Sequence, residues 1–418
     1  MEGSAVSGRC RPAPRTHRLK PSLVVEGARS TEGGFVDLVI ADGKIAALGA
    51  GAGTSVPRDV PRLDAEGALL CPPFVDGHIH LDKTLIGLPF IPHLPGDTIA
   101  ARIAAEKRIR RETPGPIQER GGRLIEQIVA FGTTAVRSHV DIDTEIGLNG
   151  LEAVLSLKES HGRLIDIQTV AFPQSGVMRD PGTAELLDAA IAAGADLVGG
   201  LDPAGIDEDI EGHLDAIFGV ACKHGVGLDV HLHDGGALGA FELRQIASRT
   251  RGLGLDGKVA VSHAFCLGDI DDADFGRTAE ALARADIAIM TNAPGPVSMP
   301  PVKRLKAMGV RVFCGSDNIR DAWSPFGNGD MLERAGIVCD RQNFRSDADL
   351  AEAFALVTEA PAAVLGRLSA LAVGARANFS LLPVHSIAEA VASRPLARTV
   401  FRDGVVVARE GRLLATNA

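Results

Sequence analysis

The sequence predicts an α/β fold in which a (β/α)8 barrel carries a small β-sandwich domain formed by both ends of the chain. Three observations support this prediction. Eight short apolar segments alternate with helical segments through the middle of the chain, and strand-like segments with Asp-Gly turns occupy both ends. Polar side chains also recur at the same end of the middle segments. Since a strand that is apolar throughout is buried on both faces, a closed parallel barrel explains the central pattern.

Each of the eight middle segments has the length and composition of a buried parallel strand. In chain order they are FVDGHIHLD, TTAVRSHVD, IDIQTVAFP, ADLVGGLDP, GLDVHLHD, KVAVSHAF, IAIMTNAP and VRVFCGSDN. Segments rich in Ala, Leu and charged residues, with helical spacing, lie between them. Eight such repeats favour a TIM barrel. An open doubly wound sheet is the alternative, and the absence of a glycine-rich nucleotide loop after the first segment counts against it.

The two ends of the chain have a pattern of their own. PSLVVEG and GFVDLVIADGKIAALGA precede the barrel, and ANFSLLP and RTVFRDGVVVAREGRLL follow it. Asp42-Gly43 and Asp403-Gly404 within them are typical of tight hairpin turns. We therefore expect one β-sandwich domain built from both ends. The expected boundaries are a disordered extension at 1–18, sandwich segments at 19–70 and 371–418, and the barrel at 71–370.

The composition limits the kind of partner and the compartment. The chain has 418 residues, a net charge of −10 and a pI near 5.7, which argues against a nucleic-acid partner. Six cysteines are scattered without a CxxC pair, which is typical of a reducing compartment. No apolar run reaches the length of a membrane span, and the basic N-terminus lacks the apolar core of a signal peptide. We expect a cytoplasmic protein without a membrane partner.

Nearly every predicted barrel strand ends in a side chain that can take part in catalysis. These residues are His78, His80, His139, Asp141, Gln174, His231, His233, Asp234, His263 and Asp317. Taken singly, each has an ordinary explanation, such as a helix N-cap for Asp317 or a core histidine bonded to a carbonyl for His263. Their recurrence favours a shared site, because the carboxyl ends of parallel barrel strands converge on one mouth.

The histidines have the spacing of metal ligands. His78 and His80 are two residues apart, so in a strand both side chains point to the same face. Two such imidazoles, a third from another strand and a carboxylate suit zinc, iron or manganese. Such a metal keeps a position open for water, lowers the pKa of that water and makes hydroxide available near neutral pH. Asp234 and His263 are suited to carry the proton to a leaving nitrogen.

A long connection, KTLIGLPFIPHLPGDTIAARIAAEKRIRRETPGPIQERGG, follows the first predicted strand. In a barrel this segment would lie over the C-terminal mouth, where active sites are built. We expect it to form part of a substrate pocket or a lid. Aromatic stacking in that pocket must come from Phe or Trp323, since the chain has no tyrosine and one tryptophan.

Together these motifs resemble the amidohydrolase superfamily and, within it, the bacterial cytosine deaminases. FVDGHIHLD, VRSHVDID, IDIQTVAFPQSG, GADLVGGL, LDVHLHD, VSHAF and GSDNIRDAWSPFGNGDML occur in the family's order. The resemblance implies metal ligands at His78, His80, His231 and Asp317. ADLVGGLDP lacks the bridging lysine of two-metal members, which implies one divalent ion, zinc or iron, with manganese as a further option.

The resemblance also implies roles for the residues around the metal. Asp317 would accept a proton from the metal-bound water. His263 would polarise the bound substrate or relay a proton. Gln174 would hydrogen-bond the ring amide of a heterocycle, and Trp323 would help to close the pocket. These assignments imply a site that reads a flat, nitrogen-containing ring.

Two departures from the cytosine deaminase pattern concern the residues that face the substrate. After the fifth strand the family has His-Cys-Asp-Glu, and this chain has His231-Leu-His233-Asp234. The shuttle acid Asp234 is therefore one methylene shorter, and His233 faces the same way as His231. After the eighth strand the family's second aspartate is replaced by Asn318. Both changes keep the ligand set and argue against cytosine itself, while structural and substrate-facing roles for His233 both stay open.

The residues therefore predict a metal-dependent deaminase that releases ammonia from a cytosine-, isocytosine-, pterin- or triazine-like ring. The alternative is hydrolysis of a cyclic amide or of an N-alkyl C–N bond without ammonia release. A non-catalytic binding barrel is a third possibility, which the complete ligand set disfavours. The expected partner is a small heterocycle. The resemblance also implies a homo-oligomer, because barrels of this family commonly assemble through helix faces.

Overall fold

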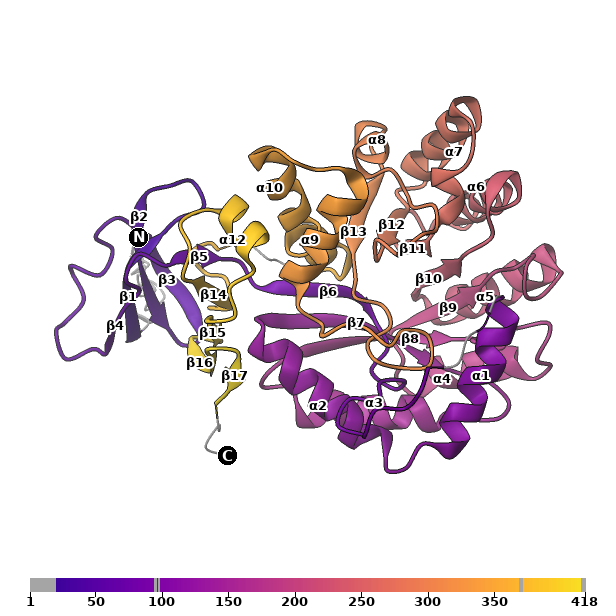
Figure 1. Ribbon diagram of the computed structural model, residues 1–418, viewed down its shortest axis with the longest axis horizontal. Coiled ribbons are helices and arrows are strands. Elements are labelled where there is room, and N and C mark those ends of the chain that lie inside the picture. The colour runs from indigo at the N-terminus through magenta and orange to yellow at the C-terminus, as the bar shows by residue number, and fades with distance from the viewer. Residues whose placement is uncertain (1–19, 94–95, 97, 368–370, 415–418) are drawn as a thin grey trace, which may run out of the picture.

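The computed structural model describes residues 20–93, 96, 98–367 and 371–414 (Figure 1). The extension predicted at 1–18 lies outside these residues. Within the described part, a parallel barrel forms the larger body, and a separate mixed sheet lies beside it. None of the described helices combines the length and apolar character that are needed to cross a membrane.

The barrel consists of the eight strands that the sequence predicts. They are β6 (Phe74–Ile79), β7 (Thr133–Asp141), β8 (Asp166–Phe172), β9 (Leu197–Leu201), β10 (Gly227–Leu232), β11 (Val259–His263), β12 (Ala288–Thr291) and β13 (Arg311–Cys314). Each strand pairs in parallel with the next one in the chain. A single bridge between Ile79 and Asp317 joins the first strand to the segment after the last one, so the barrel is nearly closed.

Helices surround the barrel strands, and the first of them lies over the cavity described below (Figure 1). They are α1 (Ile99–Glu112), α2 (Ile117–Ala130), α3 (Asn149–Ser160), α4 (Thr183–Ala192), α5 (Ile210–His224), α6 (Gly236–Gly252), α7 (Asp272–Arg284), α8 (Val302–Ala307), α9 (Met331–Gln342), α10 (Asp347–Ala355) and α11 (Glu359–Val364), with the short 3-10 helix η1 (Phe265–Gly268). In α2, Leu124, Ile125 and Ile128 recur at helical spacing and are fully buried. Burying such a side chain stabilises the fold by roughly 1.5–3 kcal/mol.

Both ends of the chain build the second sheet, as predicted. Its strands are β1 (Pro21–Arg29), β2 (Phe35–Ala41), β3 (Lys44–Gly49), β4 (Arg62–Asp64), β5 (Leu69–Cys71), β14 (Phe379–Leu382), β15 (Thr399–Arg402), β16 (Val405–Arg409) and β17 (Arg412–Leu413), and α12 (Ile387–Ser393) connects two of them. The two ends meet where β5 pairs antiparallel with β14, with Leu70 opposite Leu381. Asp403 and Gly404 form the predicted hairpin turn with φ angles of 49° and 76°.

Buried arginines of the C-terminal strand region fasten the mixed sheet to the barrel. Arg398 forms two hydrogen bonds with Asp330 at the start of α9, at 2.9 and 2.7 Å, and also donates to the Phe131 carbonyl at 2.7 Å. Arg402 pairs with Asp166 at the start of β8 at 2.7 Å. Bidentate guanidinium–carboxylate pairs fix orientation as well as contact. The mixed sheet is therefore attached at a defined angle to the barrel.

Candidate metal centre and substrate cavity

The first metal-ligand candidates lie where β6 meets the loop after β13. His78 and His80 are both buried at the end of β6. Gly315 permits the close approach, because a Cβ there would lie 2.5 Å from the backbone nitrogen of His78. The Asp317 N–H then donates to the His78 carbonyl at 2.8 Å. As a result, Asp317 Oδ1 lies 3.5 Å from His78 Nε2 and 3.3 Å from His80 Nε2.

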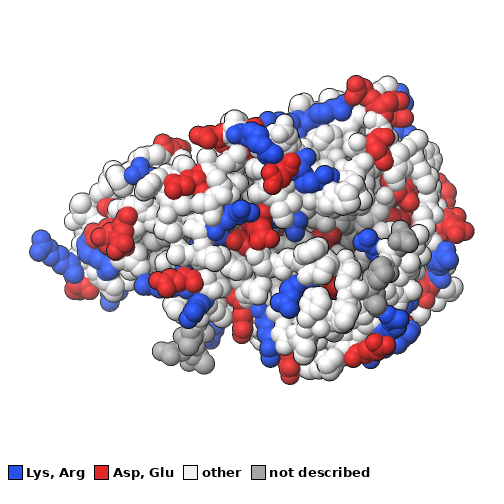
Figure 2. Space-filling model, in the orientation of Figure 1, with Lys and Arg blue, Asp and Glu red and all other residues white. Residues whose placement is uncertain are grey.

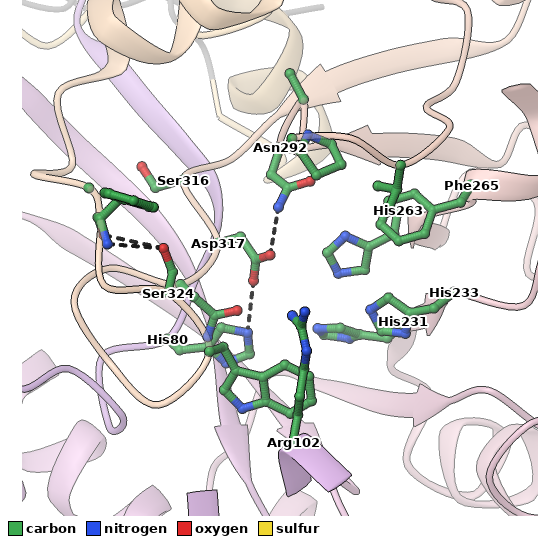
Figure 3. Close-up of a pocket in the computed structure, with 18 of the residues that line it drawn as sticks. His80, Arg102, His231, His233, His263, Phe265, Asn292, Ser316, Asp317 and Ser324 are labelled. Carbon is green, nitrogen blue, oxygen red and sulfur yellow. Dashed lines mark hydrogen bonds and ion pairs between the residues drawn. The ribbon is translucent and has the colours of Figure 1, made fainter. Parts of the chain in front are cut away.

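Asp317 is held in an uncommon conformation. Its φ of 62° lies in the left-handed region, which non-glycine residues visit rarely and which clusters at functional sites. Asn292 donates to its Oδ2 at 2.7 Å, which leaves Oδ1 for the histidines, and Figure 3 shows the carboxylate between Asn292 and His80. Burial opposes ionisation, but the adjacent imidazoles of His78, His80 and His263 outweigh it and hold the pKa of Asp317 well below its usual value. The group is therefore an anion at neutral pH.

A chain of buried polar groups orients the His78 ring through its Nδ1 atom. Its Nδ1 lies 2.9 Å from Ser262 Oγ, and the Ser262 hydroxyl donates to Asp229 at 2.8 Å. Asp229 in turn accepts from Arg137 at 2.7 Å. Because the serine proton goes to Asp229, Ser262 Oγ must accept from Nδ1. His78 therefore carries its proton on Nδ1, and its Nε2 lone pair stays free beside Asp317, as a metal ligand requires.

Two further histidines, His139 and His231, lie beside His78 and His80. His80 is oriented by the His139 carbonyl, 3.1 Å from its Nδ1. His231 lies at the end of β10 with its ring 4.6 Å from that of His78 and stacked on Phe172 at 4.0 Å. The His139 ring stacks on His78 at 3.9 Å. The sequence placed His139 at a strand end without assigning it a role, and the structure brings it into the cluster.

The cluster fits a divalent cation by its donor chemistry. Two overlapping sets, His78–His139–His231 and His78–His80–Asp317, each place three ligand atoms within 4.8 Å of one another. Among the described residues, His78 Nε2 and both ring nitrogens of His139 and His231 are buried without a hydrogen-bond partner. Such orphaned nitrogens beside a carboxylate are what a metal such as zinc satisfies.

The protonation state of these histidines also suits a metal. Burial, and then the Lys83 charge, lower the pKa of His80 to about 3. Burial and the neighbouring imidazoles hold the pKa of His139 and His231 well below the usual value. All three rings are therefore neutral at pH 7, which is the ligand form of imidazole.

A second pair of imidazoles faces the first across the site. His233 and His263 stack with their ring centroids 4.5 Å apart, and Figure 3 shows both beside His231. His263 has a φ of 74°, again in the left-handed region. Asp202 lies 2.8 Å from His233 Nδ1 and fixes that ring. The sequence did not identify Asp202, because its partner lies 31 positions away on another strand.

Asp234 does not join this group at the cavity. It lies outside the cavity lining, and its Oδ2 accepts from the Gly205 N–H at 2.9 Å. Burial, followed by the charge of Asp202, raises the pKa of Asp234. Its neighbour Glu242 accepts from the Ala204 N–H at 2.8 Å. Asp234 therefore pairs with Glu242 outside the cavity lining, whereas the adjacent His233 lines the cavity.

The cavity beside the cluster has a volume of about 780 Å³. Gln174, Trp323 and Asn318 line it, as do His233 and His263. The connection after β6 contributes α1, as expected, and residues 98, 99 and 102 face the cavity. Most of the sequence-predicted site residues thus line one cavity, whereas His78 is buried in the histidine cluster beside it and Asp234 lies outside the lining.

Lys83 organises the ring-binding side of the cavity. It donates to the Gln174 side-chain oxygen and pairs with Asp141 at 2.9 Å and Glu106 at 3.4 Å. Glu106 also accepts from the Trp323 indole N–H. Because its oxygen accepts from Lys83, Gln174 has its NH₂ group free as a donor. Helix α1, which carries Glu106, is thereby fixed over the cavity.

Comparisons with known proteins agree with this architecture. The family model described as "Amidohydrolase family" matches residues 117–408. N-isopropylammelide isopropyl amidohydrolase of Pseudomonas sp. (strain ADP) is 34% identical over 360 residues, which cover 84% of this chain and 89% of that protein. The crystal structure of N-isopropylammelide isopropylaminohydrolase from Burkholderia multivorans is 40% identical, covers 94% of this chain and 99% of that one, and has a TM-score of 0.90.

A deaminase is also similar over the same length. The crystal structure of 5-methylcytosine deaminase from Klebsiella pneumoniae, liganded with 5-fluorocytosine, is 28% identical. It covers 94% of this chain and 99% of that one, with a TM-score of 0.81. The family match extends over more than half of the chain, and the barrel, the second sheet and the histidine cluster agree with it. This chain belongs to the amidohydrolase family.

Proposed function

We propose that this protein is a metal-dependent hydrolase that removes an alkylamine from a ring carbon of a triazine-like heterocycle. The observation that carries the proposal is that one cavity is lined both by residues of the histidine cluster and by the apolar side chains of Phe265, Val297 and Ile337, which we call its apolar wall. A bare amino group would leave that wall unfilled, whereas an alkyl substituent would cover it. The similarity to two isopropylammelide hydrolases supports this choice of leaving group.

In this proposal, His78, His80, His231 and Asp317 hold one divalent ion, with zinc, iron or manganese as its identity. His139 lies within reach of the same point. When bound, the ion makes a water molecule nucleophilic near neutral pH. The remaining steps depend on side chains of the protein.

Asp317 is the proposed acceptor of the proton from the attacking water. It is ionised, and Asn292 occupies its Oδ2, so Oδ1 is the free oxygen beside the histidines. The distance from Oδ1 to His80 Nε2 is 3.3 Å, so this oxygen lies at the metal centre. A base fixed in this way needs no rearrangement when the proton is transferred.

The ring of the substrate would lie against Gln174, Trp323 and Asn318. The Gln174 NH₂ group is suited to donate to a ring carbonyl, because Lys83 occupies its oxygen. Asn318 donates its own NH₂ group to Asp321 at 2.7 Å, which leaves its oxygen as an acceptor for a ring N–H. A donor at Gln174 and an acceptor at Asn318 match the carbonyl and the N–H of an oxo-substituted nitrogen ring.

His233 and His263 are the proposed carriers of the proton to the leaving nitrogen. Asp202 orients His233 and leaves its Nε2 for the cavity. Water adds to the ring carbon, the bond from that carbon to the exocyclic nitrogen breaks, and the nitrogen takes a proton and leaves as the amine. The ring keeps the oxygen as a carbonyl. This assigns to His233 the task that the sequence motif suggested for Asp234.

Release of ammonia is the second candidate function, and the similarity to 5-methylcytosine deaminase favours it. The two candidates share the metal centre and differ in the leaving group. They are separated by incubating zinc-loaded protein with N-isopropylammelide, cytosine and 5-methylcytosine, and by assaying isopropylamine and ammonia in parallel. We expect isopropylamine from the first compound. Ammonia from a pyrimidine with no isopropylamine would overturn the first candidate in favour of the second.

A further inference from the structure

The cavity has an excess of positive charge that the proposed reaction does not use. Its lining contains Lys83, Arg102, Arg334 and Arg341, against the carboxylates of Asp317 and Glu333. The whole chain has a net charge of −10, and Figure 2 shows both signs interspersed on the face seen there. The excess of cations in the cavity is therefore a local feature rather than part of a basic protein.

The three arginines are not neutralised by carboxylates of the described residues. Arg334 donates to the carbonyls of Asn292 and Ser316, and Arg341 donates to the Val297 carbonyl at 2.6 Å. Lys83 differs, because Asp141 and Glu106 pair with it. Guanidinium groups held by backbone carbonyls keep their full charge, and a negative ligand is the natural complement.

Arg102 has the geometry best suited to such a ligand. Its Nε donates to the Gly96 carbonyl at 3.0 Å, and neither Nη atom has a hydrogen-bond partner among the residues that the structure describes. Figure 3 shows its guanidinium group pointing from α1 into the cavity, toward the space between His231 and His80. Glu106 anchors helix α1, which fixes the backbone that carries Arg102, and the bond from Nε to Gly96 holds its guanidinium group. The free edge matches a carboxylate in a bidentate pair.

We infer that the preferred substrate carries a carboxylate on its N-alkyl group, as in an N-(carboxyalkyl)amino heterocycle, and that Arg102 selects for it. This inference rests on the proposed function and names its substrate class. In this proposal the ring lies against Gln174 and Trp323 and the alkyl group lies in the same cavity, which Arg102 lines from the exposed side of α1. Because Arg102 points toward the space between His231 and His80, a carboxylate on the departing substituent would pair with it while the ring carbon stays at the metal centre.

The test compares three ammelides that differ in one group of the amine substituent: isopropyl, 1-carbamoylethyl and 1-carboxyethyl. The amide and the carboxylate have nearly the same shape. All three compounds share the ring, so ionisation of the ring affects their kcat/KM values equally and cancels in the ratio. We expect kcat/KM for the carboxylate to exceed that for the amide by about tenfold or more, the size of a charge-assisted hydrogen bond. Arg102→Gln should reduce this ratio to about one, while Arg102→Lys should keep part of it.

Arg108→Gln is the matched control, because Arg108 is exposed on the same helix and lies outside the cavity lining. It should keep the wild-type ratio. Isopropylamine release with a ratio near one in the wild type, or a ratio that Arg102→Gln leaves unchanged, would overturn the inference and leave the proposed function standing. Failure of all three compounds to release an amine would overturn both.

Discussion

Ser262 Oγ lies 2.9 Å from His78 Nδ1, and the Ser262 hydroxyl donates a hydrogen bond to Asp229. This contact fixes the tautomer of the histidine that belongs to both ligand sets. Partners behind a metal ligand commonly change metal affinity or activity by about 10- to 100-fold when they are removed. We therefore expect the buried Ser262 to affect metal binding through His78, although it is not itself a ligand candidate.

Replacing this hydroxyl should weaken metal binding. Ser262→Ala removes the acceptor of the His78 proton, and we expect zinc affinity to fall roughly 10- to 100-fold. The measurement is competition for zinc against a chromophoric chelator. Ser248→Ala, an exposed position on α6, serves as the control and should match the wild type. Equal affinity in both variants would show that Ser262 does not orient His78.

The acid at the metal centre should be indispensable for turnover. Asp317→Asn keeps the size of the side chain and removes the negative charge, so we expect kcat to fall roughly 10²- to 10⁴-fold. Circular dichroism should show an unchanged fold, because the backbone bond from residue 317 to His78 persists. A folded, zinc-loaded Asp317→Asn protein with normal turnover would contradict the role given to this carboxylate.

His233 and Asp234 are adjacent in sequence, and the structure gives them different surroundings. His233→Asn removes a cavity-facing ring, and we expect a loss of roughly 10²- to 10⁴-fold in kcat. Asp234→Asn keeps an oxygen that can accept from the Gly205 N–H, and we expect a loss of roughly tenfold at most. Steady-state kinetics of the two variants decides between them. The reverse order would restore Asp234 as the proton carrier.

Glu242 should make stability depend on pH. Burial, and then the charge of Asp234, raise its pKa to about 8 from an ordinary value of 4.5. The folded protein therefore binds this proton more tightly than the unfolded chain does, so the stabilising contribution is complete below pH 4.5 and is lost as pH rises through about 8. Glu242→Gln imitates the protonated acid and should lack this loss.

The measurement is the difference in thermal midpoint between the wild type and Glu242→Gln at pH 5, 7 and 9, with equal zinc loading. The difference should favour the variant progressively as the pH rises. Glu211→Gln, at an exposed glutamate on α5, should show no such trend. A constant difference across the range would mean that Glu242 is ionised in the folded protein at all three pH values.

The fold and the chief ligand candidates could be predicted from sequence because their signals are local. Eight apolar segments with polar ends identify a barrel, and His78 and His80 are brought together by the two-residue period of a strand. The hairpin at Asp403-Gly404 is equally local, since both residues adopt positive φ. In each case the pattern and the structure involve the same few neighbouring residues.

The surroundings of the ligands could not be predicted in this way. Ser262 reaches His78 across 184 positions, and Asn292 reaches Asp317 from the preceding strand end. The surroundings of Asp234 were equally out of reach of the sequence, because its carboxylate accepts from the Gly205 N–H, 29 positions away, and lies outside the cavity lining. Such contacts depend on how loops pack after the barrel has formed.

The central claim is that one metal ion, held by the histidine cluster and Asp317, makes hydrolysis of the ring substrate possible. It is tested most directly by titrating metal-free protein with zinc while the release of isopropylamine from N-isopropylammelide is followed. Turnover should be absent at the start, rise in proportion to added zinc and level off at one ion per chain, and His80→Ala should stay inactive throughout. Full turnover by the metal-free protein, or equal turnover by His80→Ala, would contradict the account.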